Sequence, residues 1–221
     1  MNGAPVLALS GSNLTGDVPF SCALSIDGRI ETARAAPGIR GDLAQLVANL
    51  CATCSVRPDQ VQSLRVDVGP GSYTGLRVAL TFVRFLQHFG NATVQGLDSL
   101  ALLAARAVHT GPSRVRVLLD ARRERVHTQS FDIAPGHIAA VAPAVAVPMA
   151  NVLNDLRAGD VVIIPASLPL ALQEPLRTQG AVLRLQTEVV AAEMFTPGLP
   201  FFLASTAELE PRYLMSSYAE T

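Results

Sequence analysis

The sequence feature that most constrains the fold is a glycine-rich loop between a strand-like run and a helix-like run. The loop, GPGSYTGLR, covers residues 69–77; alternating apolar residues precede it over 63–68, and helical spacing follows it over 76–89. A strand, a glycine loop and a helix N-terminus form a common phosphate-binding arrangement, because free backbone N–H groups and the positive helix end meet there. The loop therefore predicts an α/β fold and raises the question of whether an anion binds to it.

Alternating strand and helix patterns continue on both sides of the loop. Asp27 and Gly28 join two strand-like runs as a hairpin turn, and helical spacing begins at Asp42. Asp98 or Ser99 is expected to cap a further helix. This order of elements is typical of an α/β domain. The expected strands are 5–12, 20–26, 29–35, 63–68 and 93–97, and the expected helices are 42–54, 76–89 and 99–108.

A second α/β unit is expected to begin near the segment HTGPSR, because its Gly and Pro interrupt the periodic pattern. The sequence therefore predicts two domains, residues 1–109 and residues 110–221. The second domain is expected to contain two strands within 115–133 joined by a polar turn at 121–124, helices at 150–157 and 168–179, and strands at 161–165 and 182–186.

The composition is that of a globular protein. Of the 221 residues, 49% are hydrophobic and 16% are charged, so the chain can bury a substantial core. No window approaches the roughly 20 unbroken apolar residues that span a bilayer. The N-terminus lacks a basic region followed by an apolar one. We therefore expect a cytoplasmic protein without a membrane segment.

The basic residues exclude some chemistry. All 17 are arginine, so a Walker A loop with its lysine and a Schiff-base lysine are both absent. Two arginine clusters could contact RNA phosphates, but with a net charge of −1 a solvated face is the favoured interpretation. The clusters are Arg114 with Arg116, and Arg122 with Arg123 and Arg125.

No catalytic group emerges from residue spacing. The four histidines have no partner at metal-ligand spacing, which argues against a metal site. Ser72 does not fit the nucleophile pattern GxSxG because Thr74 stands where the second glycine belongs, and a helix cap is the favoured role for either residue. Asp120 followed by Arg122 could be catalytic, but a turn is favoured there.

The three cysteines leave two interpretations open. Cys51 and Cys54 form the pattern CATC inside an apolar helical stretch, and Cys22 stands alone. A redox CxxC pair is one interpretation. Small buried hydrophobic residues are the favoured one.

Several segments resemble a known family. GPGSYTGLRVAL, at residues 69–80, resembles the signature GPGSFTGLR of the TsaB (YeaZ) family. LALSGS resembles the family's first strand ILALDTS, VQGLDSLALLA resembles VxGVSSLEALA, LLDARRERVHTQSFD resembles the DARxxEVY region, and PRYLM resembles the closing PxYLR. These segments occur in family order over nearly the whole chain. The resemblance implies an actin-like ATPase fold of two α/β subdomains.

The resemblance also implies a scaffold subunit. TsaB is similar to the catalytic subunit TsaD, which holds a metal through an HxxxH pair and transfers threonylcarbamoyl to adenosine 37 of tRNAs that read ANN codons. This sequence has no HxxxH pair, and we expect no catalytic residue, metal or cofactor. The implied partners are a TsaD-like catalytic subunit, a TsaE-like ATPase, a second copy of this chain when it is alone, and tRNA through the complex.

Two departures mark the chain as a divergent member. The acidic residue of the family's DTS segment is Ser10 here, at the start of the segment from Ser10 to Ser12. The family's His-Ser-Glu helix entry is replaced at GIRGDL, from Gly38 to Leu43. Both departures argue against nucleotide binding.

The helix after the loop has two apolar stripes. One consists of Leu76, Ala79, Leu80, Val83 and Leu86, and it can face the sheet of its own domain. The other needs a cover, either from the core of its own chain or from another chain. The resemblance places intersubunit contacts on helices of the first subdomain, which favours another chain. The expected interface comprises Val78, Phe82, Phe85 and Phe89 with Leu43, Leu46, Val47 and Leu50.

We interpret the loop as the device that positions this interface helix. An anion site at the loop remains an alternative. Two functions of other classes also remain, a glycoprotease-like hydrolase and a stand-alone nucleotide-binding protein. The loop residues concerned are Gly69, Pro70, Gly71, Ser72, Tyr73, Thr74, Gly75, Leu76 and Arg77.

Overall fold

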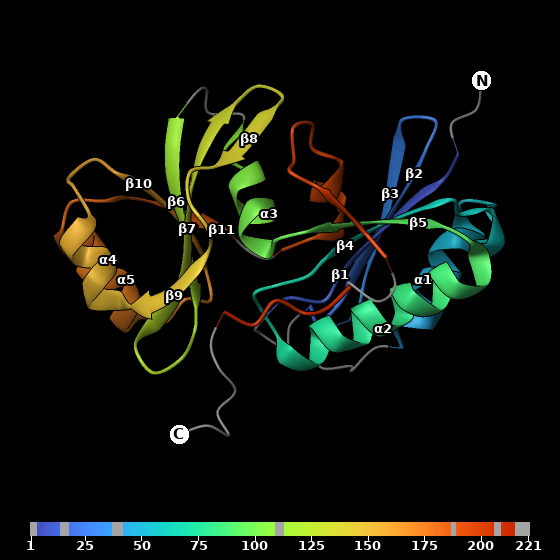
Figure 1. Ribbon diagram of the computed structural model, residues 1–221, viewed down its shortest axis with the longest axis horizontal. Helices are drawn as coiled ribbons and strands as arrows, with labels where there is room; N and C mark the ends of the chain where they lie inside the picture. Colours follow the sequence, from blue (N-terminus) through green and yellow to red (C-terminus); the bar gives the residue numbers. More distant parts are fainter. Residues whose placement is uncertain are drawn as a thin grey trace. The chain divides into compact units, whose positions relative to one another are not determined.

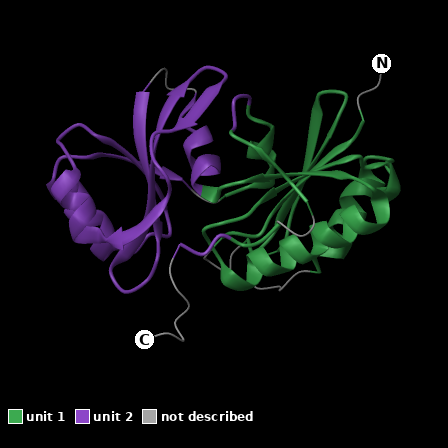
Figure 2. Ribbon diagram, viewed as in Figure 1, with its two compact units in different colours: residues 1–99, 189–196, 200–211 green, residues 100–188, 197–199, 212–221 purple. Residues whose placement is uncertain are grey.

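The computed structural model describes residues 4–13, 18–36, 42–108, 113–186, 189–205 and 209–214 (Figure 1). The chain divides into two compact units (Figure 2). Unit 1 comprises residues 1–99, 189–196 and 200–211, and unit 2 comprises residues 100–188, 197–199 and 212–221. The division of the chain into domains 1–109 and 110–221 stays a prediction about which parts fold by themselves.

The centre of unit 1 is a six-stranded sheet with the order β12-β5-β4-β1-β2-β3. Strands β1, β4 and β5 are parallel, while β2, β3 and β12 are antiparallel to their neighbours. β1 continues into β2 on one side of the sheet, and β4 continues through a helix into β5 on the other. The strands are β1 (Val6–Ser10), β2 (Ser21–Ile26), β3 (Arg29–Arg34), β4 (Ser63–Asp67), β5 (Thr93–Leu97) and β12 (Phe202–Ala204).

Two helices, α1 (Leu43–Thr53) and α2 (Tyr73–Gly90), pack on one face of this sheet (Figure 1). Asp42 caps α1 by accepting hydrogen bonds from the N–H groups of Ala44 and Gln45. Asn91 ends α2 in the left-handed conformation. A short 3-10 helix, η1 (Pro58–Gln60), precedes β4.

The opposite face of the sheet is covered by a segment from near the C-terminus, which includes the 3-10 helix η3 (Ala191–Phe195). The guanidinium group of Arg65 on β4 lies 5.1 Å from the ring centroid of Phe195 and 4.7 Å from that of Phe201. It also donates to the carbonyl oxygen of Met194 at 2.7 Å. The Val189 N–H donates to the Asn13 side chain at 2.9 Å. The sheet of unit 1 is therefore covered on this face by residues 189–196 and 200–211, which follow in the sequence after most of unit 2.

Unit 2 contains a second sheet with the order β11-β10-β6-β7-β8, and β9 also pairs with β7. Helices α4 and α5 cover one face, and their apolar residues pack on Leu118, Val126, Val162 and Ile164. The strands are β6 (Ser113–Asp120), β7 (Arg125–Ala134), β8 (His137–Ala140), β9 (Val145–Pro148), β10 (Val161–Pro165) and β11 (Val182–Gln186); the helices are α3 (Ser99–Ala105), α4 (Met149–Asp155) and α5 (Leu170–Thr178).

The sequence-based elements are confirmed to within a few residues. The hairpin at Asp27 and Gly28 has both residues at positive φ, and the β6–β7 hairpin is present with its turn at the expected place. The pattern missed β8, β9, η3 and β12, which have five residues or fewer. In the part of the chain that the structure describes, no helix is long and apolar enough to cross a membrane.

Candidate functional site

The loop of residues 69–77, which we call the signature loop, connects β4 to α2. Ser72 is the N-cap residue of α2, and its side chain accepts a hydrogen bond from the Gly75 N–H at 3.2 Å. The Ser72 N–H donates to the carbonyl oxygen of Ser12 at 2.8 Å, and the Leu76 N–H donates to the Ser72 carbonyl oxygen at 2.9 Å. These three N–H groups at the start of α2 are therefore bonded within the chain.

Two glycines of the loop are required by close packing. A Cβ atom on Gly71 would overlap the backbone of Ser12, and one on Gly75 would overlap the carbonyl oxygen of Gly11. Reciprocally, a Cβ atom on Gly11 would lie 2.5 Å from the Gly75 carbonyl oxygen. Gly69 alone in the loop has a positive φ, of 104°. The segment after β1 thus lies directly against the first turn of α2.

Asp67 is the last residue of β4, and its side chain is fully buried at the ends of β1 and β4. The Ser10 hydroxyl donates to Asp67 Oδ2 at 2.9 Å, and the Gly11 N–H donates to Oδ1 at 3.3 Å. The Ser99 hydroxyl approaches Oδ2 at 3.4 Å. Burial raises the pKa of the Asp67 carboxyl group, although these hydrogen bonds partly oppose the change.

Our sequence analysis did not single out Asp67. Ser10 stands where the resemblance predicts an acidic residue, but the neighbouring strand supplies a carboxyl group that contacts the Ser10 side chain. An available signal was an acidic residue between two apolar ones, Val66 and Val68, immediately before the signature loop. The other departure, from Gly38 to Leu43, lies mostly outside the described residues, because 37–41 are not described.

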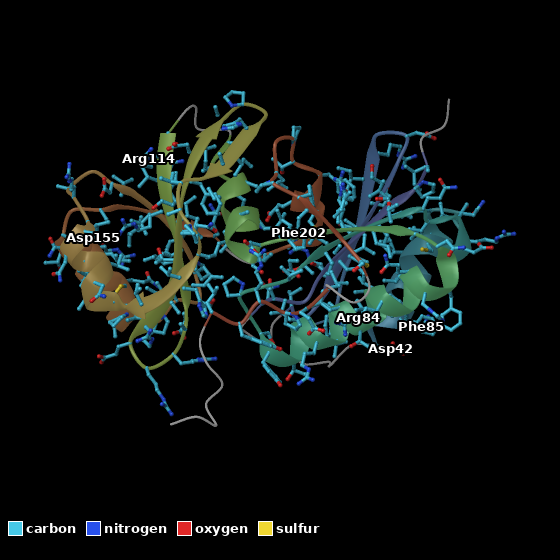
Figure 3. All side chains as sticks on the ribbon, viewed as in Figure 1. Asp42, Arg84, Phe85, Arg114, Asp155 and Phe202 are labelled. Atoms are coloured by element: carbon cyan, nitrogen blue, oxygen red, sulfur yellow. The ribbon has the colours of Figure 1, made fainter. Side chains whose placement is uncertain are left out.

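The outward side of α2 carries an apolar stripe. Val78, Phe85 and Phe89 are 40%, 57% and 71% exposed, and the ring centroids of the two phenylalanines lie 4.6 Å apart. Figure 3 shows Phe85 on the outer side of the helix. Phe82 differs from these three because it is only partly exposed and packs against the core. We call Val78, Phe85 and Phe89 the α2 stripe.

The α1 part of the expected interface is wrong for three residues. Leu43, Val47 and Leu50 are 4%, 3% and 4% exposed, and they pack in the core of unit 1. Leu46 is partly buried against the same core. The apolar period of α1 marks the side that faces the sheet, so these three side chains have no surface left for a partner.

Ion pairs and turns hold Arg114 and Arg122 of the two arginine clusters. Arg114 forms a bidentate ion pair with Asp132, in which the shorter distance, Nε to Oδ1, is 2.7 Å. Asp120 accepts a hydrogen bond from the Arg122 N–H at 2.7 Å, which confirms the turn. Arg77 lies over the Tyr73 ring. Among the described residues, no group of three or more His, Cys, Asp and Glu side chains could hold a metal ion.

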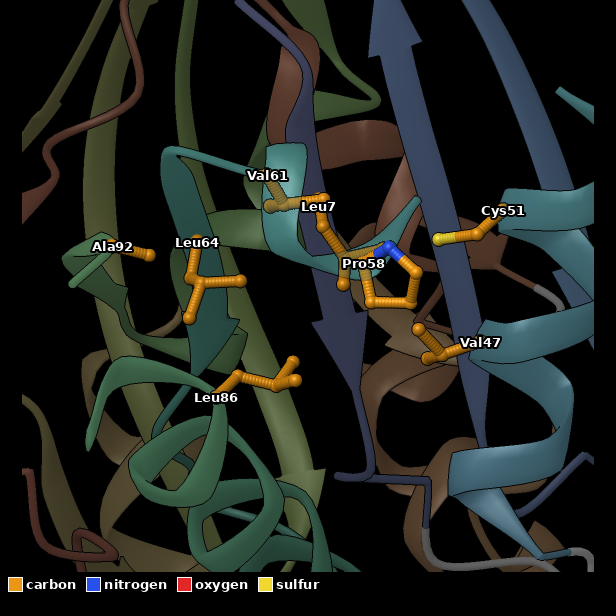
Figure 4. A pocket seen from close by; sticks show the side chains of 8 residues that line it. All are labelled: Leu7, Val47, Cys51, Pro58, Val61, Leu64, Leu86 and Ala92. Atoms are coloured by element: carbon orange, nitrogen blue, oxygen red, sulfur yellow. The ribbon is translucent and has the colours of Figure 1, made fainter. Parts of the chain in front are cut away.

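Cys22 and Cys51 are buried among apolar residues, whereas Cys54 is only partly buried. Burial raises the pKa of the Cys22 thiol to about 12, and burial also raises the pKa values of the Cys51 and Cys54 thiols. A raised pKa disfavours the reactive thiolate. Cys51 lines a small apolar pocket between α1, α2 and η1, with a volume of only about 10 Å³ (Figure 4). The other lining residues are Leu7, Val47, Pro58, Val61, Leu64, Leu86 and Ala92.

Comparison with known proteins places the chain in a family. Residues 35–168 match the family model described as TsaD, tRNA N6-adenosine threonylcarbamoyltransferase. The chain belongs to this family. It is also 31% identical over 114 residues to tRNA threonylcarbamoyladenosine biosynthesis protein TsaB of Bacillus subtilis (strain 168). That match covers 52% of this chain, and it spans about half the length of the relative, 49%.

Solved structures show the same fold over nearly the whole chain. YeaZ from Pseudomonas aeruginosa aligns with a TM-score of 0.77 and 21% identity, covering 96% of this chain and 100% of that one. A second structure, of an uncharacterized protein with similarity to peptidase YEAZ from Pseudomonas aeruginosa, aligns with a TM-score of 0.79 and 22% identity over the same shares. The two-unit α/β fold is thus shared with YeaZ structures, and the relatives named TsaB and YeaZ support the divergent TsaB (YeaZ) membership that the resemblance implied.

Proposed function

We propose that this chain is a non-catalytic partner subunit in the cytoplasmic formation of N6-threonylcarbamoyladenosine at position 37 of tRNAs that read ANN codons. It binds a TsaD-like catalytic subunit through the α2 stripe and meets a TsaE-like ATPase and tRNA within the complex. Without that partner, the same stripe pairs two copies of the chain. The signature loop positions α2 for this contact.

The observation that carries the proposal is the α2 stripe itself. Two phenylalanines on one helix face, 57% and 71% exposed and in ring contact, form a contiguous apolar surface of the kind that often marks an interaction site. The stripe begins within one helical turn of the signature loop, which carries the resemblance to the family. Family membership supports the choice of a TsaD-like subunit as the partner.

The size of the stripe sets what the contact can contribute. A phenylalanine exposes about 200 Å² when fully accessible, so Phe85 and Phe89 together expose about 250 Å². Burial of that area is favourable by about 6 kcal/mol. Association costs of about 4–15 kcal/mol oppose it. The stripe is therefore the centre of a larger interface and cannot support a complex alone.

The first experiment measures complex formation with the TsaD-like protein of the same organism by titration calorimetry. Phe85→Glu removes about 3 kcal/mol of apolar burial, so we expect at least about a 100-fold loss of affinity without unfolding. Leu170→Glu is the matched control, because Leu170 is 68% exposed on α5 in unit 2. Unchanged affinity with Phe85→Glu, or an equal loss with Leu170→Glu, would refute the interface.

The second experiment tests the pathway. Depletion of this protein in its host should lower the threonylcarbamoyladenosine content of tRNA nucleosides measured by mass spectrometry, and the intact gene should restore it. The purified chain alone should transfer nothing. Normal nucleoside levels would refute the proposed pathway, and ATP or peptide hydrolysis that Ser72→Ala abolishes would favour one of the two enzymatic alternatives.

A further inference from the structure

The buried carboxyl group of Asp67 lies at a special point of the sheet. β1 and β4 are adjacent parallel strands, and the chain leaves them in opposite directions, toward β2 and toward α2 (Figure 1). In α/β sheets, this switch point at the carboxyl ends of the strands is where ligands bind. Here the Gly11 and Ser12 backbone packs against the signature loop at this point, and Asp67 is 0% exposed. The carboxyl group therefore faces its own chain and not a ligand.

Three separate segments meet at this carboxyl group, and the contacting residues all lie within residues 1–99 of unit 1. Ser10 and Gly11 bring the end of β1, and Asp67 itself leads into the signature loop. Ser99 brings the start of α3, and the Ser99 N–H also donates to the carbonyl oxygen of Gly69 at 2.9 Å. One side chain thus joins the strand end, the loop entry and the next helix.

A stability role alone does not account for an acid here. No ion pair to Asp67 occurs among the described residues, and a carboxyl group buried without a cation is destabilising compared with an apolar residue of the same size. An apolar residue could not accept the hydrogen bonds that link Asp67 to Ser10, Gly11 and Ser99. The carboxyl group therefore contributes the relative positions of these segments and not stability.

We propose that Asp67 is a positioning residue for α2: its carboxyl group fixes the signature loop against the end of β1 and the start of α3, and so holds the α2 stripe in its binding position. This inference rests on the proposed function for the partner contact. The positioning itself is a property of the isolated chain. It can therefore be tested with and without the partner.

The first test is amide hydrogen exchange of residues 69–77 in the isolated full chain. Asp67→Ala should increase exchange there by about tenfold or more, because it leaves the Gly11 N–H and two hydroxyl groups without an acceptor. Asp67→Asn keeps an oxygen acceptor and should remain within about threefold of the unaltered chain. Asp59→Asn is the control, because it removes an exposed carboxyl group from the same unit. Equal exchange in the Ala variant and the unaltered chain would overturn the proposal.

A pH series separates positioning from simple packing. Burial is the largest influence on the pKa of Asp67 and raises it, whereas the hydrogen bonds from Ser10, Gly11 and Ser99 lower it. As pH rises, ionisation of the buried group should loosen the junction, so exchange at 69–77 should rise beyond its intrinsic pH dependence. Asp67→Asn cannot ionise and should lack this increase. The same increase in the Asn variant would contradict the proposal.

A double variant that swaps the side chains of Ser10 and Asp67 provides a test if Asp67→Ala does not fold. Ser10→Asp with Asp67→Ser keeps one carboxyl and one hydroxyl group between β1 and β4, so it should protect residues 69–77 better than Asp67→Ser alone. No recovery in the double variant would overturn the proposal. In partner binding, normal affinity of Asp67→Ala with loss in Phe85→Glu would refute only this inference, whereas no binding by the unaltered chain would refute the proposed function.

Discussion

A Gly75→Ala substitution tests the close packing of the signature loop. The added Cβ atom would overlap the carbonyl oxygen of Gly11, and the reverse contact, Gly11 Cβ to Gly75 O, is 2.5 Å. Carbon contacts normally lie at about 3.5–4.0 Å, and the contact made by a Gly75 Cβ is shorter than its reverse, so the two backbones must separate by more than about 1 Å. Gly11 directly follows β1, and Gly75 lies in the first turn of α2, so the separation would move a strand end away from a helix. Such overpacking costs about 2–4 kcal/mol, offset by up to about 1 kcal/mol from the helix propensity of alanine.

The matched control is Gly90→Ala at the other end of α2. An added Cβ atom there meets no atom within 4 Å, so the same substitution should stabilise the chain by about 0.5–1 kcal/mol. Differential scanning calorimetry should then show the melting temperature fall by about 5–10 °C for Gly75→Ala and rise by about 2 °C for Gly90→Ala. The test is whether the two substitutions change the melting temperature in opposite directions. A Gly75→Ala chain as stable as the unaltered one would show that β1 and α2 do not approach as closely as the structure has them.

Three further predictions concern other parts of the chain. Burial lowers the pKa of His127 to about 4, so the ring stays neutral in the folded state, while the unfolded chain gains a proton below about pH 6.5. The free energy of unfolding should therefore fall by about 2–3 kcal/mol between pH 6.5 and 4. His127→Gln should flatten that part of the pH–stability curve. A Cβ atom on Gly96 would overlap the Phe202 ring, so Gly96→Ala should detach β12 and increase amide exchange at 202–204, with unchanged exchange as the contrary result. A fragment of residues 1–109 should show no cooperative unfolding by circular dichroism, since it lacks the segments that cover one face of its sheet; a cooperative transition would instead support the sequence-based domain boundary.

Local patterns in the sequence were sufficient for most of the fold. Leu76, Ala79, Leu80 and Val83 recur at helical spacing, and all four are buried, because periodicity reports directly on the side of a helix that faces a core. The N-cap role of Ser72 followed from residue type. Strand β12 could not be found in the same way. Its three residues have no usable period, and its place is fixed by the packing of Phe202 on Gly96, more than a hundred residues away in sequence.

The candidate site was less predictable than the fold for a related reason. Periodicity identifies an apolar helix face, but it does not say whether the cover comes from the same chain. On α2 the second stripe is largely exposed, while the apolar face of α1 at Leu43, Val47 and Leu50 is covered by the sheet. Asp67 escaped notice because its partners, Ser10 and Ser99, are 57 and 32 residues distant in sequence. Such groups become visible only when the strand order is known.

The packing of the loop gives its glycines a role in the fold that does not depend on a bound ligand. A glycine kept for phosphate binding becomes replaceable once the ligand is lost, because its free space is no longer used. Gly71 and Gly75 are not in that position, since their missing side chains make room for Ser12 and Gly11 of the same chain. Any larger residue would separate α2 from β1, whether or not a ligand binds. The placement of α2 against the end of β1 is therefore sufficient by itself to require glycine at positions 71 and 75.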